Sequence, residues 1–389
     1  MNLEEWEAAL GRWSMARAAT GGGKSENGVA SASATDSAKT ATRDATEAGE
    51  DLTAGSQVER PQTAWLDSVE QPAMACEFEV LLNRHQYTHG IEHARDSLRV
   101  VHDLEKMFSI YRPLSDFSTV NRWGHQRPVA VRVDVARLLL LSQEISRQTG
   151  GAFDITAGSL SEVWGFSRRQ GRKPDEEELV RALGLVGWDK FNVDEVASTI
   201  RIEREGVRLN PGAIGKGYAL DRVANQMLDV GVEHFLIHGG RSSVLARGTR
   251  HDLTVRDGWW IALAHPLRWE EKLGRIRITN RALGTSGAGK QFFHYQGVRY
   301  SHVIDPRTGW PAQGVLSATA LCRSGALADA LATAFMVMGV ESTREFCRRH
   351  PSASAILVST EPGSSRLSID RINLPDEDWD PGRELRTSH

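Results

Sequence analysis

The stretch "ALADALATAFMVMG", residues 326–339, places two polar side chains inside an otherwise apolar run. Its composition predicts a strongly apolar helix over residues 326–338. Asp329 and Thr333 are four residues apart, so they share one face of that helix, one turn from each other. A buried carboxylate is energetically costly unless it is paired or coordinates a cation. The stretch therefore predicts a core helix that carries one polar, chemically capable face.

Two interpretations of this polar pair stay open. Oxygen ligands one helical turn apart suit a hard cation such as Mg²⁺, which takes few protein ligands and completes its shell with substrate oxygens and water. Alternatively, Asp329 interacts with the helix dipole while the Thr333 hydroxyl bonds to the carbonyl four residues earlier.

Apolar periodicity elsewhere predicts interleaved helices and strands. Helical spacing covers residues 91–108, 133–149 and 218–230. Strand patterns cover residues 76–82, 234–240, 258–266, 275–287 and 353–360, and residues 191–202 read as a hairpin. Because the two kinds of element alternate irregularly and several strand pairs look antiparallel, the pattern favours an α+β fold over a regular βαβ array.

Composition narrows the class of protein. The chain has 389 residues, 40% of them hydrophobic, and a formal net charge of -3, which is typical of a globular protein without the basic face of a nucleic-acid binder. Its three cysteines, Cys76, Cys322 and Cys347, have no metal-ligand spacing and no disulfide pattern. No run approaches the roughly 18 apolar residues of a membrane span, and no secretory signal is visible. We therefore expect a cytoplasmic protein without an integral membrane segment.

The chain divides by composition into four parts. Residues 1–19 predict a short amphipathic helix, because Trp6, Leu10 and Trp13 recur at helical spacing. Residues 20–62 are poor in large apolar side chains and predict a disordered linker. Residues 63–372 form the expected folded domain, and residues 373–389 predict a charged tail.

Three further stretches concentrate polar residues beside glycines. "LNPGAIGKGYALD" (209–221) combines glycines and a lysine before a helix, which suits either phosphate binding or a plain strand-to-helix turn. "GGAFDITAGSLSEVWGF" (150–166) fits a loop pinned by Asp154, or a ligand-binding loop. "YSHVIDPRTG" (300–309) is good turn chemistry around Asp305-Pro306, and it also presents His302, whose ordinary pKa of ~6.5 suits proton transfer.

These stretches, taken in order with "FSIYRPLSDFSTVNR" (108–122), "GVEHFLIHGG" (231–240) and "LGTSG" (283–287), resemble the ApbE family, the FAD:protein FMN transferases. The resemblance runs from about residue 73 to residue 358. It implies an ApbE-like (T-fold-like) arrangement of mixed sheets with packed helices. It also implies Mg²⁺-dependent transfer of FMN from FAD to a Ser or Thr hydroxyl of an acceptor protein, with release of AMP.

The resemblance also implies roles for individual residues. Asp329 and Thr333 would bind the metal together with a backbone carbonyl at Gly215, and His302 would act in transfer as the general base. The cofactor-binding positions that match family blocks are Tyr111, Ser115, Asn121, Asp154, Thr156, Lys216, Tyr218, Asp221, Gly239, Gly240, Ser286 and Gly287.

Three departures from the family wording leave alternatives open. Arg241 follows Gly240 where an acidic or small polar residue is usual, "AGKQ" follows "TSG", and Cys76-Glu77 replaces a small residue and a threonine. A protein that binds FAD without transferring FMN, and a pyrophosphatase that hydrolyses FAD to FMN and AMP, are therefore the competing functions.

Overall fold

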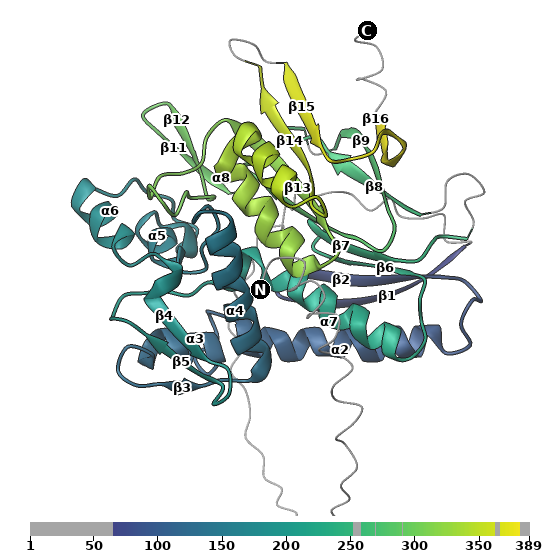
Figure 1. The fold of residues 1–389 in the computed structure, drawn as a ribbon, viewed down its shortest axis with the longest axis horizontal. Coiled ribbons are helices and arrows are strands. Elements are labelled where there is room, and N and C mark those ends of the chain that lie inside the picture. Colours follow the sequence, from purple (N-terminus) through teal and green to yellow (C-terminus); the bar gives the residue numbers. More distant parts are fainter. Residues whose placement is uncertain (1–64, 252–257, 269, 290, 362–365, 382–389) are drawn as a thin grey trace, which may run out of the picture.

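The computed structural model describes residues 65–251, 258–268, 270–289, 291–361 and 366–381. The helix expected at residues 1–19 and the linker expected at 20–62 lie outside these residues. Within them the fold is α+β, as the alternation of patterns predicted, and its centre is one large antiparallel sheet (Figure 1).

The central sheet has eight strands in the order β1-β2-β6-β7-β10-β13-β14-β15, and each neighbouring pair is antiparallel. The side chains alternate between two buried faces, as in β6, all five of whose residues are buried. The strand bounds are β1 Leu66–Ala73, β2 Cys76–Asn83, β6 Phe235–Gly239, β7 Ser243–Arg247, β10 Ala282–Gly287, β13 Val315–Cys322, β14 Ser354–Thr360 and β15 Leu367–Ile372.

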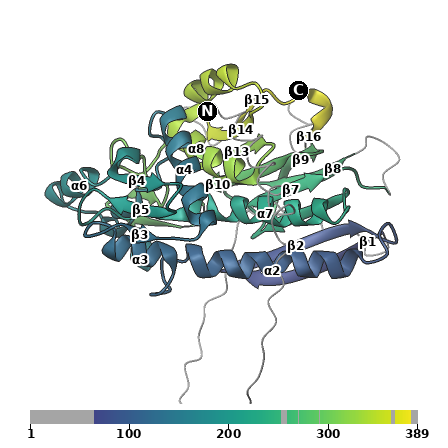
Figure 2. The same cartoon turned by 60° about the horizontal axis from the view of Figure 1, so that its bottom comes forward.

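Helices cover one face of this sheet and form the main core with it. Helices α2, α7 and α8 lie side by side on this face, with α2 against β1, α7 against β6 and β7, and α8 against β10 and β13 (Figures 1 and 2). Apolar residues such as Leu98, Val101 and Leu104 recur at helical spacing on α2 and are fully buried. The helices are α2 Gly90–Phe108, α3 Asp116–Trp123, α4 Val133–Gln148, α7 Gly215–Asp229 and α8 Gly325–Arg349.

A smaller sheet covers part of the other face and closes a second core around Trp259, Ile276 and Leu283. Its order is β16-β9-β8, with bounds Trp379–Pro381, Lys272–Ile278 and Trp259–Ala264. Strand β16 pairs with β9, so the described fold continues past residue 372 into the segment that composition alone assigned to a tail.

The remaining elements gather beside α4 and α8. Strands β3 (Val129–Ala130), β5 (Thr199–Ile202) and β4 (Phe191–Asp194) form a three-stranded sheet. Helices α5 (Gly158–Val163) and α6 (Glu176–Leu183) enclose a third core with the hairpin of β11 (Phe292–Tyr295) and β12 (Val298–Ser301). Short 3-10 turns lie at Phe166–Arg168, Trp188–Lys190, Pro211–Ala213 and Asp376–Asp378.

The helices and strands expected within the described residues are present. Where their ends differ from the predicted bounds, the local backbone gives the reason. Helix α7 begins at Gly215, three residues before the predicted start, because the glycine-lysine-glycine turn is already helical. The predicted helix end at Met338 coincides with a break in α8 at Gly339, whose φ of 74 and ψ of -179 are not helical.

Helix α8 is the one element of the described residues that is long and apolar enough to cross a membrane. In this fold, however, 61% of its most apolar 18-residue window is buried inside the protein. It is therefore the central core helix that the sequence predicted.

Helices α7 and α8 touch through backbone at a pair of glycines. A Cβ built on Gly217 would lie 2.0 Å from the Gly325 carbonyl oxygen, and a Cβ on Gly325 would lie 2.5 Å from the Gly217 carbonyl oxygen. No side chain fits between the two helices there, so glycine at both positions sets how closely they cross.

Gly217→Ala should therefore destabilise the fold. We expect the free energy of unfolding, measured by urea denaturation, to fall by about 1–3 kcal/mol, because the added methyl group forces the two helices apart. The control is Gly184→Ala, where the nearest atom to the added Cβ is the end of the flexible Arg204 side chain at 3.3 Å and the next two lie at ordinary contact distances of 3.5 and 3.6 Å. Equal stability of the two variants would contradict the close-contact explanation.

Candidate active site

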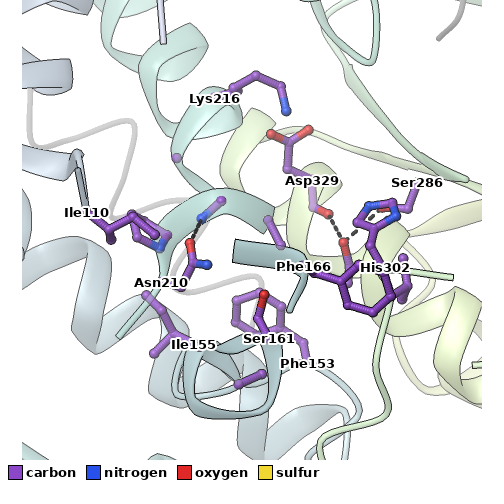
Figure 3. Close-up of a pocket in the computed structure, with 18 of the residues that line it drawn as sticks. Ile110, Phe153, Ile155, Ser161, Phe166, Asn210, Lys216, Ser286, His302 and Asp329 are labelled. Atoms are coloured by element: carbon purple, nitrogen blue, oxygen red, sulfur yellow. Dashed lines mark hydrogen bonds between the residues drawn. The ribbon is translucent and has the colours of Figure 1, made fainter. Parts of the chain in front are cut away.

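A cavity of about 570 Å³ opens where α7, α8 and the end of β10 meet the 152–158 loop and the segment after β12. Figure 3 shows Asp329, Lys216, Ser286 and His302 around it. Nine of the sixteen site residues expected from the sequence line this one cavity: Tyr111, Asp154, Gly215, Lys216, Ser286, Gly287, His302, Asp329 and Thr333. Segments that are far apart in the chain thus converge on one site.

Asp329 is buried in the first half of α8, and its carboxylate is held on both sides. Its Oδ2 accepts a hydrogen bond from the Gly217 backbone N–H at 2.7 Å, and its Oδ1 accepts one from the Ser243 hydroxyl at 2.7 Å. Lys216, which precedes Gly217 in the first turn of α7, lies beside the carboxylate in Figure 3. The carboxylate is therefore fixed against the start of α7 at the cavity wall.

Thr333 lies one turn further along α8. Its hydroxyl is 2.8 Å from the Ser286 hydroxyl on β10, and it makes a longer contact of 3.4 Å with the Asp329 carbonyl. The bond to the carbonyl four residues earlier, one of the two sequence interpretations, is thus present but weak. The shorter contact joins α8 to β10 and holds two hydroxyls at the cavity.

The donor set at this wall suits a hard cation. Asp329, Thr333 and Ser286 offer oxygen atoms only, and each Asp329 oxygen uses one of its lone pairs in a hydrogen bond to the protein. Among the described residues no group of three or more His, Cys, Asp or Glu side chains could hold a metal. A set of few protein oxygens is the type that Mg²⁺ uses when water and substrate complete its shell.

His302 directly follows β12 and is oriented by its own hairpin. Its Nδ1 lies 3.1 Å from the Gln291 carbonyl oxygen, which only accepts hydrogen bonds. The neutral ring therefore carries its proton on Nδ1 and its lone pair on Nε2. The edge of the imidazole packs against Phe166, at 6.5 Å between ring centroids. This orientation makes Nε2 a proton acceptor at the cavity.

Asp154 lines the cavity and also pins its loop. Its Oδ1 accepts hydrogen bonds from the Thr156 backbone N–H at 2.9 Å and from the Thr156 hydroxyl at 2.6 Å, while Oδ2 accepts one from Ser146 at 3.0 Å. Burial raises the pKa of the Asp154 carboxyl, although these hydrogen bonds partly oppose the shift. The interpretation of Asp154 as a loop-pinning residue agrees with these contacts.

Five other expected cofactor-binding residues support the walls from behind. Ser115 caps α3 and bonds to the Ser109 carbonyl, and Asn121 bonds both backbone groups of Leu209. The Thr156 hydroxyl also accepts a bond from the Gly187 N–H at 2.8 Å. The remaining two belong to α7: Tyr218 and Asp221.

Tyr218 and Asp221 tie α7 to its neighbours. The Tyr218 hydroxyl donates to Asp134 at 2.8 Å, and burial is the main cause that raises the pKa of this phenol. Asp221 accepts bonds from the backbone N–H groups of Gly325 and Ala326 and from the Ser324 hydroxyl, so it caps the start of α8. Burial raises its pKa against the effect of these bonds. Both residues position the helix that carries Asp329.

The glycine pair after β6 shapes a turn. Gly239 packs against Phe78, and Gly240 has a φ of 58 and lies beside Cys76. Arg241, the unusual residue after this pair, is exposed with a φ of 60. The described residues that line the cavity include Ser242 but not Arg241.

Several residues of the site were not identified from the sequence. Ser243, which holds Asp329, follows the glycine pair, and only its place in the turn could have drawn attention to it. Met74 and Ala75 form the tight turn between β1 and β2 with φ values of 51 and 57, and both line the cavity. Positive φ values at two non-glycine residues have no signal in the sequence. Apolar lining comes from Phe153, Ile155, Ile110, Val303 and Ile304.

The cavity of this α+β fold brings together a fixed carboxylate, paired hydroxyls and an oriented imidazole, groups that can serve cation binding and proton transfer. Residues 74–357 match the model of the ApbE family, and the chain belongs to that family. It is a transferase.

Relatives and solved structures agree with this assignment. An FAD:protein FMN transferase of Vibrio cholerae is 30% identical over 271 residues, covering 68% of this chain and 79% of its own. One of Treponema pallidum is 27% identical and covers 70% and 79%. The crystal structure of the ApbE protein of Thermotoga maritima has a TM-score of 0.69 at 27% identity, covering 79% of this chain and 97% of its own. The apo flavinyl transferase ApbE of Pseudomonas stutzeri has a TM-score of 0.71 at 25% identity, covering 82% and 98%.

Asp154→Asn should change how stability depends on pH. Because burial raises the pKa of Asp154, the folded protein keeps this proton to a higher pH than the unfolded chain does. The stability that protonation provides is present below the unfolded pKa of about 3.9 and is lost as pH rises through the folded pKa.

The free energy of unfolding of Asp154→Asn should therefore improve relative to wild type as the pH rises from about 4, in urea titrations at several pH values. A difference that stays constant across this range would show that the Asp154 pKa is the same in both states.

Proposed function

We propose that this protein transfers the FMN half of FAD to a Ser or Thr hydroxyl of an acceptor protein and releases AMP. The acceptor oxygen forms a bond to the phosphorus of the FMN half, and the bond from that phosphorus to the AMP phosphate oxygen breaks. The observation that carries the proposal is the convergence of Asp329, Thr333 and His302 on one cavity. The names of the family relatives support flavin as the transferred group.

His302 accepts the proton of the attacking hydroxyl. Its Nδ1–H is engaged by the Gln291 carbonyl, so Nε2 carries the lone pair that takes the proton. The hairpin before it and the Asp305-Pro306 turn after it hold the ring in place. Asp305 accepts hydrogen bonds from the backbone and side chain of Arg307, so the turn is internally tied.

Asp329 and Thr333 would hold the metal, with the Gly215 carbonyl as the third protein ligand. Bound Mg²⁺ would neutralise charge on the pyrophosphate oxygens. Asp329 is suited to this role because Gly217 and Ser243 fix its orientation. Lys216 places a positive charge beside the same wall, which favours the binding of an anionic dinucleotide.

The rest of the cavity fits a flat aromatic ligand. Phe153, Ile155, Ile110 and Phe166 provide apolar walls, and Tyr111 stands exposed at the margin. Burial of apolar rings against such walls contributes about 25 cal/mol per Å² of area removed from water. Asp154 and Ser286 add polar groups that orient the ligand.

His302→Ala should lower the rate of FMN transfer by about 10²–10⁴-fold, because the hydroxyl loses its proton acceptor. The measurement follows covalent flavin on an acceptor by mass and AMP by chromatography. FAD affinity, measured by flavin fluorescence, should change little. The control is His125→Ala, which removes a half-buried histidine that does not line the cavity. An unchanged transfer rate in His302→Ala would rule out the assigned role.

Asp329→Asn should raise the Mg²⁺ concentration needed for half-maximal transfer by more than about tenfold, since the neutral amide is a weaker ligand for a hard cation. EDTA should abolish transfer by the wild-type enzyme. The control is the exposed Asp229→Asn at the end of α7. Mg²⁺ dependence that is identical in all three proteins would place the metal elsewhere.

The same assays separate the competing functions. FMN and AMP formed without any labelled acceptor would identify a pyrophosphatase, and bound FAD without AMP would identify a binding protein. Arg241 motivated the second alternative. Its exposed position, with Ser242 rather than Arg241 among the described residues that line the cavity, favours transfer.

A further inference from the structure

We propose that the acceptor protein docks on the β11–β12 hairpin and on the neighbouring basic loop, residues 167–173, through an extended acidic segment that flanks its hydroxyl. The inference rests on the proposed function, because transfer to a protein requires a second chain to bring its hydroxyl to His302. It adds the surface that receives this chain and the chemistry that the surface selects.

The β11–β12 hairpin directly contacts His302, the proposed general base. The His302 backbone N–H donates to the Gln291 carbonyl at 3.0 Å, and the His302 Nδ1 lies 3.1 Å from the same oxygen. The residue before β11 and the residue after β12 therefore meet at the cavity, which both of them line. A chain whose hydroxyl reaches Nε2 of His302 must pass the base of this hairpin.

One face of the hairpin is buried in the third core near His302 and exposed to solvent near the turn. Phe293 stacks on Tyr300 and packs into the third core. Further out on the same face, Tyr295 and Val298 are paired across the strands and are 42% and 44% exposed. Trp310 contacts Trp164 and is 42% exposed. In the part of the chain that the structure describes, β11 and β12 pair only with each other, so their outer edges suit an extended peptide.

The basic loop lies against the same hairpin. The Gln291 side chain donates to the Phe166 carbonyl at 3.0 Å, and Gly171 packs so closely on Phe293 that a Cβ would lie 2.4 Å from its ring. The Lys173 ammonium is 5.5 Å from the centre of the Tyr295 ring and 5.7 Å from that of Trp310. Loop and hairpin therefore form one continuous surface, which Figure 1 places beside α5 and α6.

The charge of this surface is positive. Arg168 and Arg169 are exposed, and no ion pair joins either of them to another described residue. Arg172 is neutralised by Glu178, at 2.7 Å. At the start of α6, Asp175 and Glu178 form a capping box and Glu177 pairs with Arg181, while Glu176 is exposed. Arg168, Arg169 and Lys173 are thus the charges offered to a partner, and they complement acidic side chains.

The dimensions set the length of the recognised segment. Val298 and His302 are four positions apart on a strand that rises about 3.3 Å per residue, so the surface extends about 13 Å from the base. It covers about four extended residues of the acceptor on one side of its hydroxyl. Because Arg168 and Arg169 are exposed near the cavity, their positive charge also raises the rate at which an acidic partner associates.

The test uses displayed peptides of random sequence around a single threonine, incubated with the enzyme, FAD and Mg²⁺. Flavin-labelled peptides are captured and sequenced. Wild type should enrich Asp and Glu near the threonine, and the double variant R168E/R169E should lose or reverse this enrichment. The matched control R95E/R127E, which changes two exposed arginines on α2 and before β3, should keep it.

An enriched peptide is then tested directly. R168E/R169E should weaken its binding, measured by fluorescence anisotropy without FAD or metal, by about tenfold. Y295A/V298S should raise the KM for the peptide about fivefold at a similar kcat. The control V196S changes a fully exposed valine at another hairpin turn and should have no effect on either value.

Labelled peptides without an acidic preference, or equal enrichment by R168E/R169E and R95E/R127E, would overturn the docking surface and leave the transferase function standing. A wild-type enzyme that binds FAD but labels no peptide would contradict the proposed function itself, and the docking surface would fall with it.

Discussion

The site depends on the backbone contact between α7 and α8 at Gly217 and Gly325. Because neither residue has a Cβ, the first turn of α7 lies against the first turn of α8, and the Gly217 N–H reaches the Asp329 carboxylate at 2.7 Å. Asp221 strengthens the same junction by capping α8 from α7. A carboxylate buried in an apolar helix is thus stabilised by donors from another helix and from Ser243.

This junction explains why the metal-ligand candidates and the imidazole come together. Helix α8 brings Asp329 and Thr333, β10 brings Ser286 to Thr333, and the β11–β12 hairpin brings His302 to the same cavity. Each side chain is oriented by a bond to the protein before any ligand binds. Preorganised groups of this kind do not have to be reordered during the reaction, which is the main advantage of a fixed site in phosphoryl-type transfer.

Sequence patterns predicted the α+β fold, and the family resemblance implied that the distant motifs form one site, but neither showed which residues line the cavity and which support its walls. Asp329 and Thr333 could be paired from helical spacing alone. Ser115, Asn121, Tyr218 and Asp221 were expected at the cofactor, whereas the structure places them behind the walls. Polar side chains beside glycines look alike whether they bind a ligand or a neighbouring backbone, because both uses need the same hydrogen-bonding groups.

The turn of Met74 and Ala75 combines an energetically costly backbone conformation with a place in the cavity wall. Both residues adopt left-handed backbone angles that Asn and Gly adopt at lower energetic cost. An Asn-Gly turn would make this hairpin more stable, but it would remove the thioether of Met74 from the cavity wall. The stability of this turn and the present shape of the cavity wall therefore make opposite demands on these two positions.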